Sequence, residues 1–126
     1  MARTVTYWIS TGLLAALSAF AGFTYLTGSE QAIAGFAHVG YPQQLRVLLG
    51  IAKVAGTIAL LVPGIPMIKE WAYAGFTFAW IAAFFAHYLA GDGAEALTPL
   101  VLLVFLAVSY LTRPETRRVR TRVALA

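Results

Sequence analysis

Residues 45–61 read LRVLLGIAKVAGTIALL, and the chain then continues into Pro63, Gly64 and Pro66. The run is apolar and close to the about 20 residues that a helix needs to cross a bilayer. The prolines that follow it indicate a tight reversal. Lys53 stands inside this run, where a charge is disfavoured by about 2.5 kcal/mol or more. We therefore expect Lys53 to face the protein interior or a water-lined cavity and to mark a candidate functional site.

The composition extends this interpretation to the whole chain. Of its 126 residues, 60% are hydrophobic and only 11% are charged, which is far outside the range of a soluble domain. Further apolar runs occupy residues 7–26, 70–90 and 98–111. The sequence predicts an all-α integral membrane bundle of four transmembrane helices over residues 1–112, followed by a basic cytoplasmic tail at residues 113–126.

A short additional helix is predicted between the first and second spans. Thr27 and Glu30 have the spacing of a capping box, and Gly40 followed by Pro42 supplies a stop. The segment between them is too short to cross a bilayer, and Ile33, Phe36 and Ala37 share one of its faces. We expect an interfacial helix that covers one end of the bundle.

The second span presents a face of small or polar residues around its lysine. Arg46, Gly50, Lys53 and Thr57 are separated by helical spacings. This face should pack inward and leave room beside Lys53.

The first span carries a weakly polar stripe, because Thr11, Ser18 and Tyr25 recur every seven residues. Ser18 and Gly22 also have the small-xxx-small spacing that lets two membrane helices approach closely. This face is expected to be buried.

The third span combines aromatic residues with a histidine. One face of this span carries Tyr73, Phe76, Trp80, Ala83 and His87. An adjoining face, with Gly75, Ala79 and Ala83, suits close helix packing. The fourth span is rich in Leu and Val and poor in small residues, so we expect it at the periphery of the bundle.

Lys53 has two interpretations that the sequence leaves open. In the first, it extends outward and pairs with Glu30, Asp92 or a helix-end carbonyl, which fixes the register of the bundle without chemistry. In the second, its ammonium binds an anionic or carbonyl-bearing lipophile or relays a proton. The ligand-binding residues of this second hypothesis are Lys53, His87, Trp80, Thr57 and Tyr25.

Several classes of function have no candidate residues in the sequence. The chain has no cysteine, which excludes thiol chemistry and Cys-ligated metals. It has no carboxylate in the first span, on which small multidrug transporters depend, and no phosphate-binding loop or Ser/His/Asp arrangement. Two histidines fall short of the four that a two-haem bundle requires. We expect neither haem nor a metal site, and no catalytic residue can be named.

The basic residues are concentrated at one end of the chain. Five of the nine follow the fourth span, and these are Arg113, Arg117, Arg118, Arg120 and Arg122. Arginines next to a membrane favour an anionic cytoplasmic leaflet. We predict that they contact anionic lipid, that both termini are cytoplasmic, that Lys69 lies in the middle connection, and that nucleic acid is not a partner.

Three stretches resemble the DoxX-like family of small four-helix membrane proteins. They are FAHVGYP at residues 36–42, LGIAKVAG at residues 49–56 and KEWAYAGF at residues 69–76. The resemblance implies a bundle in the bacterial cytoplasmic (inner) membrane. Some relatives are associated with a thiosulfate:quinone oxidoreductase, and animal relatives act as assembly chaperones. The wider family often has Glu where this chain has Lys53, which separates this chain from any carboxylate-based role.

Together these observations predict an accessory or quinone- or lipid-binding component of membrane redox metabolism. The protein is not expected to catalyse a reaction alone, although it could be a subunit of a membrane oxidoreductase. The first alternative is a non-catalytic assembly or chaperone-type protein that binds another membrane protein or a second copy of itself. A small transporter is the weaker alternative, because one charged residue provides little of a pathway.

Overall fold

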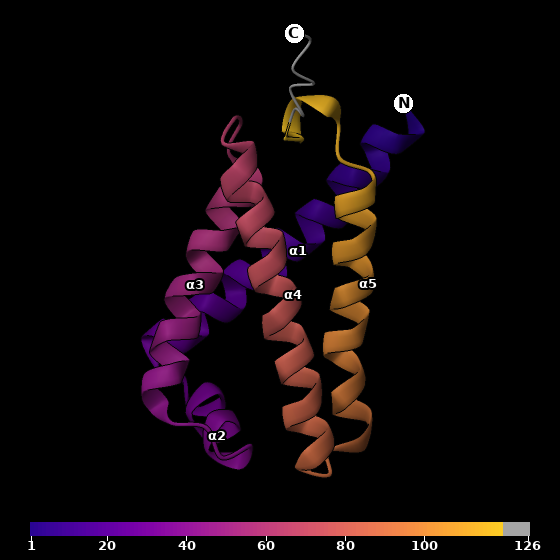
Figure 1. Ribbon diagram of the computed structural model, residues 1–126. Helices are drawn as coiled ribbons and strands as arrows, with labels where there is room; N and C mark the ends of the chain where they lie inside the picture. Colours follow the sequence, from indigo (N-terminus) through magenta and orange to yellow (C-terminus); the bar gives the residue numbers. More distant parts are fainter. Residues whose placement is uncertain (120–126) are drawn as a thin grey trace, which may run out of the picture.

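The computed structural model describes residues 1–119, which form helices and turns without a β-strand (Figure 1). In chain order the helices are α1 (Ala2–Thr27), α2 (Glu30–His38), α3 (Gln43–Leu61), α4 (Pro66–Leu89), η1 (Gly93–Ala96), α5 (Leu97–Leu111) and η2 (Glu115–Arg117). Four segments within this range are long and apolar enough to cross a membrane: α1, α3, α4 and the continuous stretch of η1 and α5. The predicted four-span helical bundle is confirmed.

The spans form a bundle with the chain ends on one side. In Figure 1, α3, α4 and α5 run roughly alongside one another and α1 crosses them obliquely. α1 packs against α3 and α5, while α4 packs between the same two helices. The described parts of the two terminal regions lie at the upper end of the view, and α2 lies at the lower end with the α4–α5 turn. The short helix therefore covers the end of the bundle opposite the termini.

Two glycines allow α1 and α3 to approach closely. A Cβ atom on Gly22 would lie 2.8 Å from Val54 Cγ2 and 3.2 Å from the carbonyl oxygen of Gly50. A Cβ atom on Gly50 would lie 2.9 Å from Leu26 Cγ. The contacts of 2.8 and 2.9 Å are shorter than real Cβ atoms make, so a larger residue at either position would force the helices or their side chains to shift. The close packing predicted from Ser18 and Gly22 is present.

The core is a cluster of apolar side chains from four helices, namely Leu14, Leu60, Tyr73, Phe76, Trp80 and Leu106. A chain of buried hydroxyls lies beside it. The Ser109 Oγ is 2.6 Å from Thr11 Oγ1 and 2.7 Å from the Tyr73 hydroxyl, so three helices are joined at one residue. The expectation that α5 lies at the periphery was wrong for the face that carries Ser109. The prediction rested on the Leu/Val-rich composition of α5 and did not take the buried hydrogen bonds of Ser109 into account.

The start of α2 differs from the prediction. Ser29 is the N-cap of α2, and its hydroxyl accepts a hydrogen bond from the backbone N–H of Ala32. The expected capping box was wrong, because Thr27 is still part of α1 and its hydroxyl donates to the carbonyl of Phe23. Gly28 follows in the left-handed conformation that ends many helices.

Candidate functional site

Lys53 occupies the middle of α3 and is buried between three helices. Its side chain is only 9% exposed. The Nζ atom lies 5.5 Å from the ring centroid of Trp80 on α4 and 5.7 Å from that of Tyr25 on α1. These separations are within the range of a cation–π interaction. Within residues 1–119, Nζ has no hydrogen bond to an acceptor and no ion pair. Neither Glu30, Asp92 nor a helix-end carbonyl takes the pairing role that one interpretation gave it.

The backbone of α1 and α3 fixes the surroundings of this ammonium. The close crossing at Gly22 brings the second half of α1 against α3, so Tyr25 reaches Lys53. Arg46 anchors the same crossing by donating to the carbonyl of Tyr25. The Thr57 hydroxyl donates to the carbonyl of Lys53 at 2.7 Å. Thr57 thus satisfies its own proton and keeps lone pairs available.

A groove of about 300 Å³ lies between α3 and α4, and Lys53 is part of its lining. Its walls are mostly small residues, including Ala52, Gly56, Gly75 and Ala79. Gly75 was expected to pack closely against a helix. Instead, a Cβ atom there would meet nothing within 4 Å, because this face of α4 borders the groove. Gly56 is different, since a Cβ there would lie 2.8 Å from the Phe76 ring.

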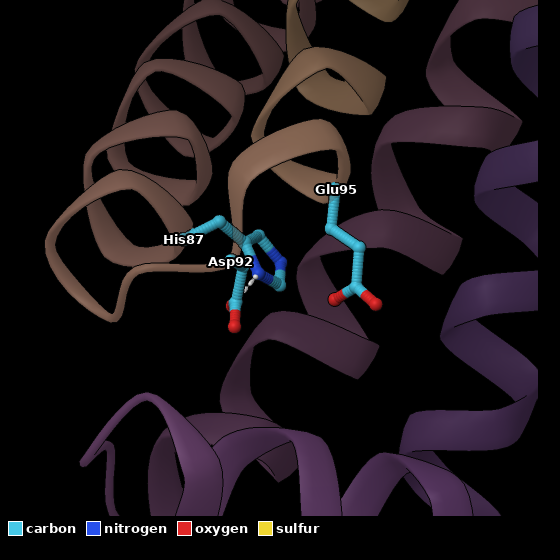
Figure 2. Close-up of side chains that lie close together, drawn as sticks. All are labelled: His87, Asp92 and Glu95. Carbon is cyan, nitrogen blue, oxygen red and sulfur yellow. Dashed lines mark hydrogen bonds and ion pairs between the residues drawn. The ribbon is translucent and has the colours of Figure 1, made fainter.

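His87 does not join the Lys53 group. It lies in the last turn of α4, and its Nδ1 atom is 2.7 Å from Oδ2 of Asp92 (Figure 2). The other carboxylate oxygen of Asp92 is 2.5 Å from Nε2 of His38 on α2. An ionised carboxylate only accepts hydrogen bonds, so each imidazole presents an N–H to it. Asp92 thereby joins α2 to the end of α4.

These hydrogen bonds also change the acid–base behaviour of the groups. The hydrogen bond to Asp92 raises the pKa of His38 above its ordinary value. The hydrogen bonds from His87 and His38 lower the pKa of Asp92. Glu95 of η1 completes the group: its carboxylate, His87 and Asp92 each offer one ligand atom, and all of these atoms lie within 4.8 Å of one another. We call His38, His87, Asp92 and Glu95 the loop cluster.

A second buried lysine, Lys69, lies at the end of the bundle opposite the loop cluster. Its position differs from the one predicted from the sequence. Lys69 is 1% exposed within α4 and is not in the α3–α4 connection as expected. Its Nζ donates to the carbonyls of Ala59 at 2.6 Å and of Val62. The turn is shorter than expected because α4 already begins at Pro66. Lys69 therefore satisfies the carbonyls at the end of α3, which is the position that a cation prefers.

Two arginines of the expected tail also contact the bundle. Arg117 donates to the carbonyls of Leu60 at 2.8 Å and of Leu61 at 3.0 Å. Arg113 pairs with Glu70 and lies over the Tyr110 ring, 3.6 Å from its centroid. The chain thus folds back onto the bundle beyond α5, and these two guanidiniums are engaged there.

For the remaining arginines of the tail, contact with anionic lipid stays a prediction. Arg118 is partly exposed and donates to the carbonyl of Arg113 at 2.8 Å. Arg120 and Arg122 lie outside the described residues, so their predicted contact with anionic lipid stays a prediction.

A family model described as the DoxX-like family matches residues 9–109. The match includes most of each of the four spans and both groups of residues described above, and the chain belongs to this family. Comparison with curated proteins and with solved structures gave no match.

Proposed function

We propose that this DoxX-like protein is an accessory component of membrane redox metabolism that binds a quinone or a lipid in the α3–α4 groove. The observation that supports this most is Lys53, a buried residue whose ammonium has no acceptor among residues 1–119. A buried charged donor without an acceptor is unfavourable at membrane depth. A ligand oxygen placed beside Nζ removes that penalty. The unpaired donor therefore favours ligands that carry an acceptor oxygen.

The walls of the groove suit the rest of such a ligand. The volume of about 300 Å³ is at the lower end of small-molecule sites, and it suits a quinone ring or a lipid headgroup linkage with the start of its chain. Phe76 and Trp71 supply the aromatic surface of the lining, whereas Trp80 and Tyr25 lie beside the Lys53 ammonium and outside the lining. The small residues of α3 and α4 leave space for an aliphatic chain that continues into the bilayer. In this proposal Lys53 binds the ligand oxygen, Phe76 and Trp71 contact the ring, and Trp80 and Tyr25 hold the ammonium from the side of the core.

His87 is not included in the proposed ligand set. Its Nδ1 is held by Asp92, and it lies seven residues beyond Trp80 on α4, which is about 10 Å along a helix. Substituting His87 with alanine should leave groove binding unchanged. The proposed ligand-binding site therefore does not contain His87, which the sequence-based prediction had included.

Binding of a short-chain ubiquinone analogue to the protein in nanodiscs tests the proposal. Quenching of tryptophan fluorescence reports the binding, and lipids extracted from the purified protein report a phospholipid occupant by mass spectrometry. Lys53→Met should abolish the binding of either ligand by removing the donor. Gly75→Leu should block the groove without an internal clash, and Gly12→Leu, at a position equally free of neighbours on α1, should not. Absence of both ligands from wild type, or binding unaffected by Lys53→Met, would overturn the proposal.

A second candidate function is a non-catalytic assembly protein, favoured by the small residues that line the groove. Small residues let a partner helix approach closely in a membrane, and Gly75 and Ala79 border open space. Purification from native membranes separates the candidates. A stoichiometric protein partner that is lost in Gly75→Leu and retained in Lys53→Met would favour assembly, since helix docking depends on the shape of the groove and not on the ammonium.

We place the protein in the bacterial cytoplasmic membrane with both termini in the cytoplasm. This orientation is supported by Arg3 in the first turn of α1, Lys69 in the first turn of α4 and Arg118 directly after η2, whereas Asp92 and Glu95 belong to the turn and η1 between α4 and α5. Because the chain lacks cysteine, single-cysteine variants report it directly. Ala94→Cys should react with a membrane-impermeant maleimide added to intact cells, and Glu115→Cys should react only after lysis. The reverse pattern would invert the topology.

A further inference from the structure

The loop cluster has the composition and spacing of a metal site. His87, Asp92 and Glu95 come from the end of α4, the turn and η1, and they present one imidazole and two carboxylates. One ligand atom from each lies within 4.8 Å of the others. In Figure 2 the two carboxylates lie on either side of the His87 ring. One nitrogen and two oxygens, with water at the open position, form a donor set suited to divalent first-row transition metals.

The fourth member of the loop cluster supplies the outer contact that such sites use. Carboxylates that ligate a metal are usually held by hydrogen bonds of their own. The free oxygen of Asp92, Oδ1, is 2.5 Å from Nε2 of His38, while Oδ2 faces His87. His38 belongs to α2, so a ligand of the turn is oriented by the covering helix. The groups are also accessible, because Glu95 is exposed and a third of the His87 side chain is exposed.

We propose that the loop cluster binds a divalent transition metal of the Zn²⁺ class, with His87, Asp92 and Glu95 as ligands and His38 as a positioning residue. The cation replaces the proton now shared between His87 Nδ1 and Asp92 Oδ2. Their 2.7 Å separation must widen to about 3.3 Å, the ligand-to-ligand distance of a tetrahedral site with bonds of about 2.0 to 2.1 Å. The proton leaves to solvent, as expected when a metal displaces it from an imidazole. The bound metal ties the end of α4 to η1, and the His38–Asp92 hydrogen bond holds α2 to the same turn.

Titration of tag-free, EDTA-treated protein in nanodiscs tests this proposal. Zn²⁺ is followed by calorimetry, and Co²⁺ by its visible absorption, which reports the donor set and geometry. Wild type should bind one ion of either metal. His87→Ala and Glu95→Gln should abolish saturable binding, and both positions are accessible enough for the fold to persist. Glu30→Gln, at an exposed acid of α2 outside the loop cluster, is the matched control and should bind as wild type does.

The positioning residue has its own readout. His38→Phe should keep the 1:1 stoichiometry but weaken binding about 10-fold or more, as loss of an outer hydrogen bond does, and it should shift the Co²⁺ spectrum. Absence of saturable binding to wild type would overturn the proposal. So would binding that His87→Ala and Glu95→Gln leave unchanged, or equal losses in Glu30→Gln, because these outcomes indicate unspecific attraction to acidic groups.

Discussion

The two buried lysines provide the sharpest prediction, because the same substitution should have opposite effects on them. Lys53→Met removes an ammonium that has two aromatic neighbours and no acceptor among the described residues. A charge at the centre of a span costs about 2.5 to 3.5 kcal/mol, and two cation–π contacts return about 0.5 to 1 kcal/mol each. The expected net effect on ligand-free protein is a stabilisation of about 1 to 2 kcal/mol.

Lys69→Met is the matched comparison. The Lys69 ammonium donates to two carbonyls at the end of α3, and methionine supplies neither hydrogen bond. Hydrogen bonds to charged groups contribute about 1.5 to 3 kcal/mol each. Of the two carbonyls left behind, only that of Val62 keeps a contact among residues 1–119, with Arg117 at 3.4 Å. We expect a destabilisation of about 3 kcal/mol or more.

Reversible unfolding by steric trapping in lipid bicelles, after removal of co-purified lipophiles, measures both variants against wild type. Adding the quinone analogue should stabilise wild type and leave Lys53→Met unaffected, since only the ammonium binds it. A loss of stability in ligand-free Lys53→Met comparable to that of Lys69→Met would refute the reasoning. Lys53 would then be a structural anchor of the bundle and not a binding group.

Two further substitutions test the packing that positions the groove. Ser109→Ala should destabilise the bundle by about 1 kcal/mol, because it removes two interhelical hydrogen bonds that contribute about 0.6 kcal/mol each. Its control is Ser18→Ala, which removes a buried hydroxyl that lacks a partner among residues 1–119 and should be neutral or stabilising in the same unfolding assay. Equal losses of stability in the two variants would contradict the role of the hydroxyl chain. Gly22→Ala should destabilise by about 1 to 3 kcal/mol through overpacking at the α1–α3 crossing, whereas Gly12→Ala at an open position should not; similar thermal midpoints for the two would show that α1 can shift without cost.

The spans and the burial of Lys53 could be predicted because local sequence determines both. An apolar run of bilayer length defines a span wherever it occurs. Helical spacing placed Lys53 on the same face as Gly50 and Thr57, and that face is buried. Trp80 was likewise expected on an inward face of α4, and it lies against Lys53.

What could not be predicted depends on contacts between residues far apart in the sequence. Arg117 reaches the carbonyl of Leu60 across 57 positions, and no local pattern distinguishes it from the arginines beside it. His38 and Asp92 meet across 54 positions, which requires α2 to fold over the α4–α5 turn. The local sequence did contain a signal for His87, because only five positions, including a glycine turn, separate it from Asp92. Its place on the same helix face as Trp80 led instead to the prediction that it binds the ligand together with Lys53.

The covering helix α2 connects the groove with the loop cluster. Tyr25, which flanks Lys53, meets Phe36 of α2 edge-on with ring centroids 5.1 Å apart, and His38 at the end of α2 bonds to Asp92. If α2 transmits binding, the coupling must be reciprocal: the factor by which Zn²⁺ changes the affinity for the quinone analogue equals the factor by which the analogue changes the affinity for Zn²⁺. Phe36→Ala removes the connecting contact and neither set of ligand-binding residues, so it should bring both factors close to one. Affinities that are independent of the other ligand already in wild type would make α2 a passive cover, and each site would then have to be understood alone.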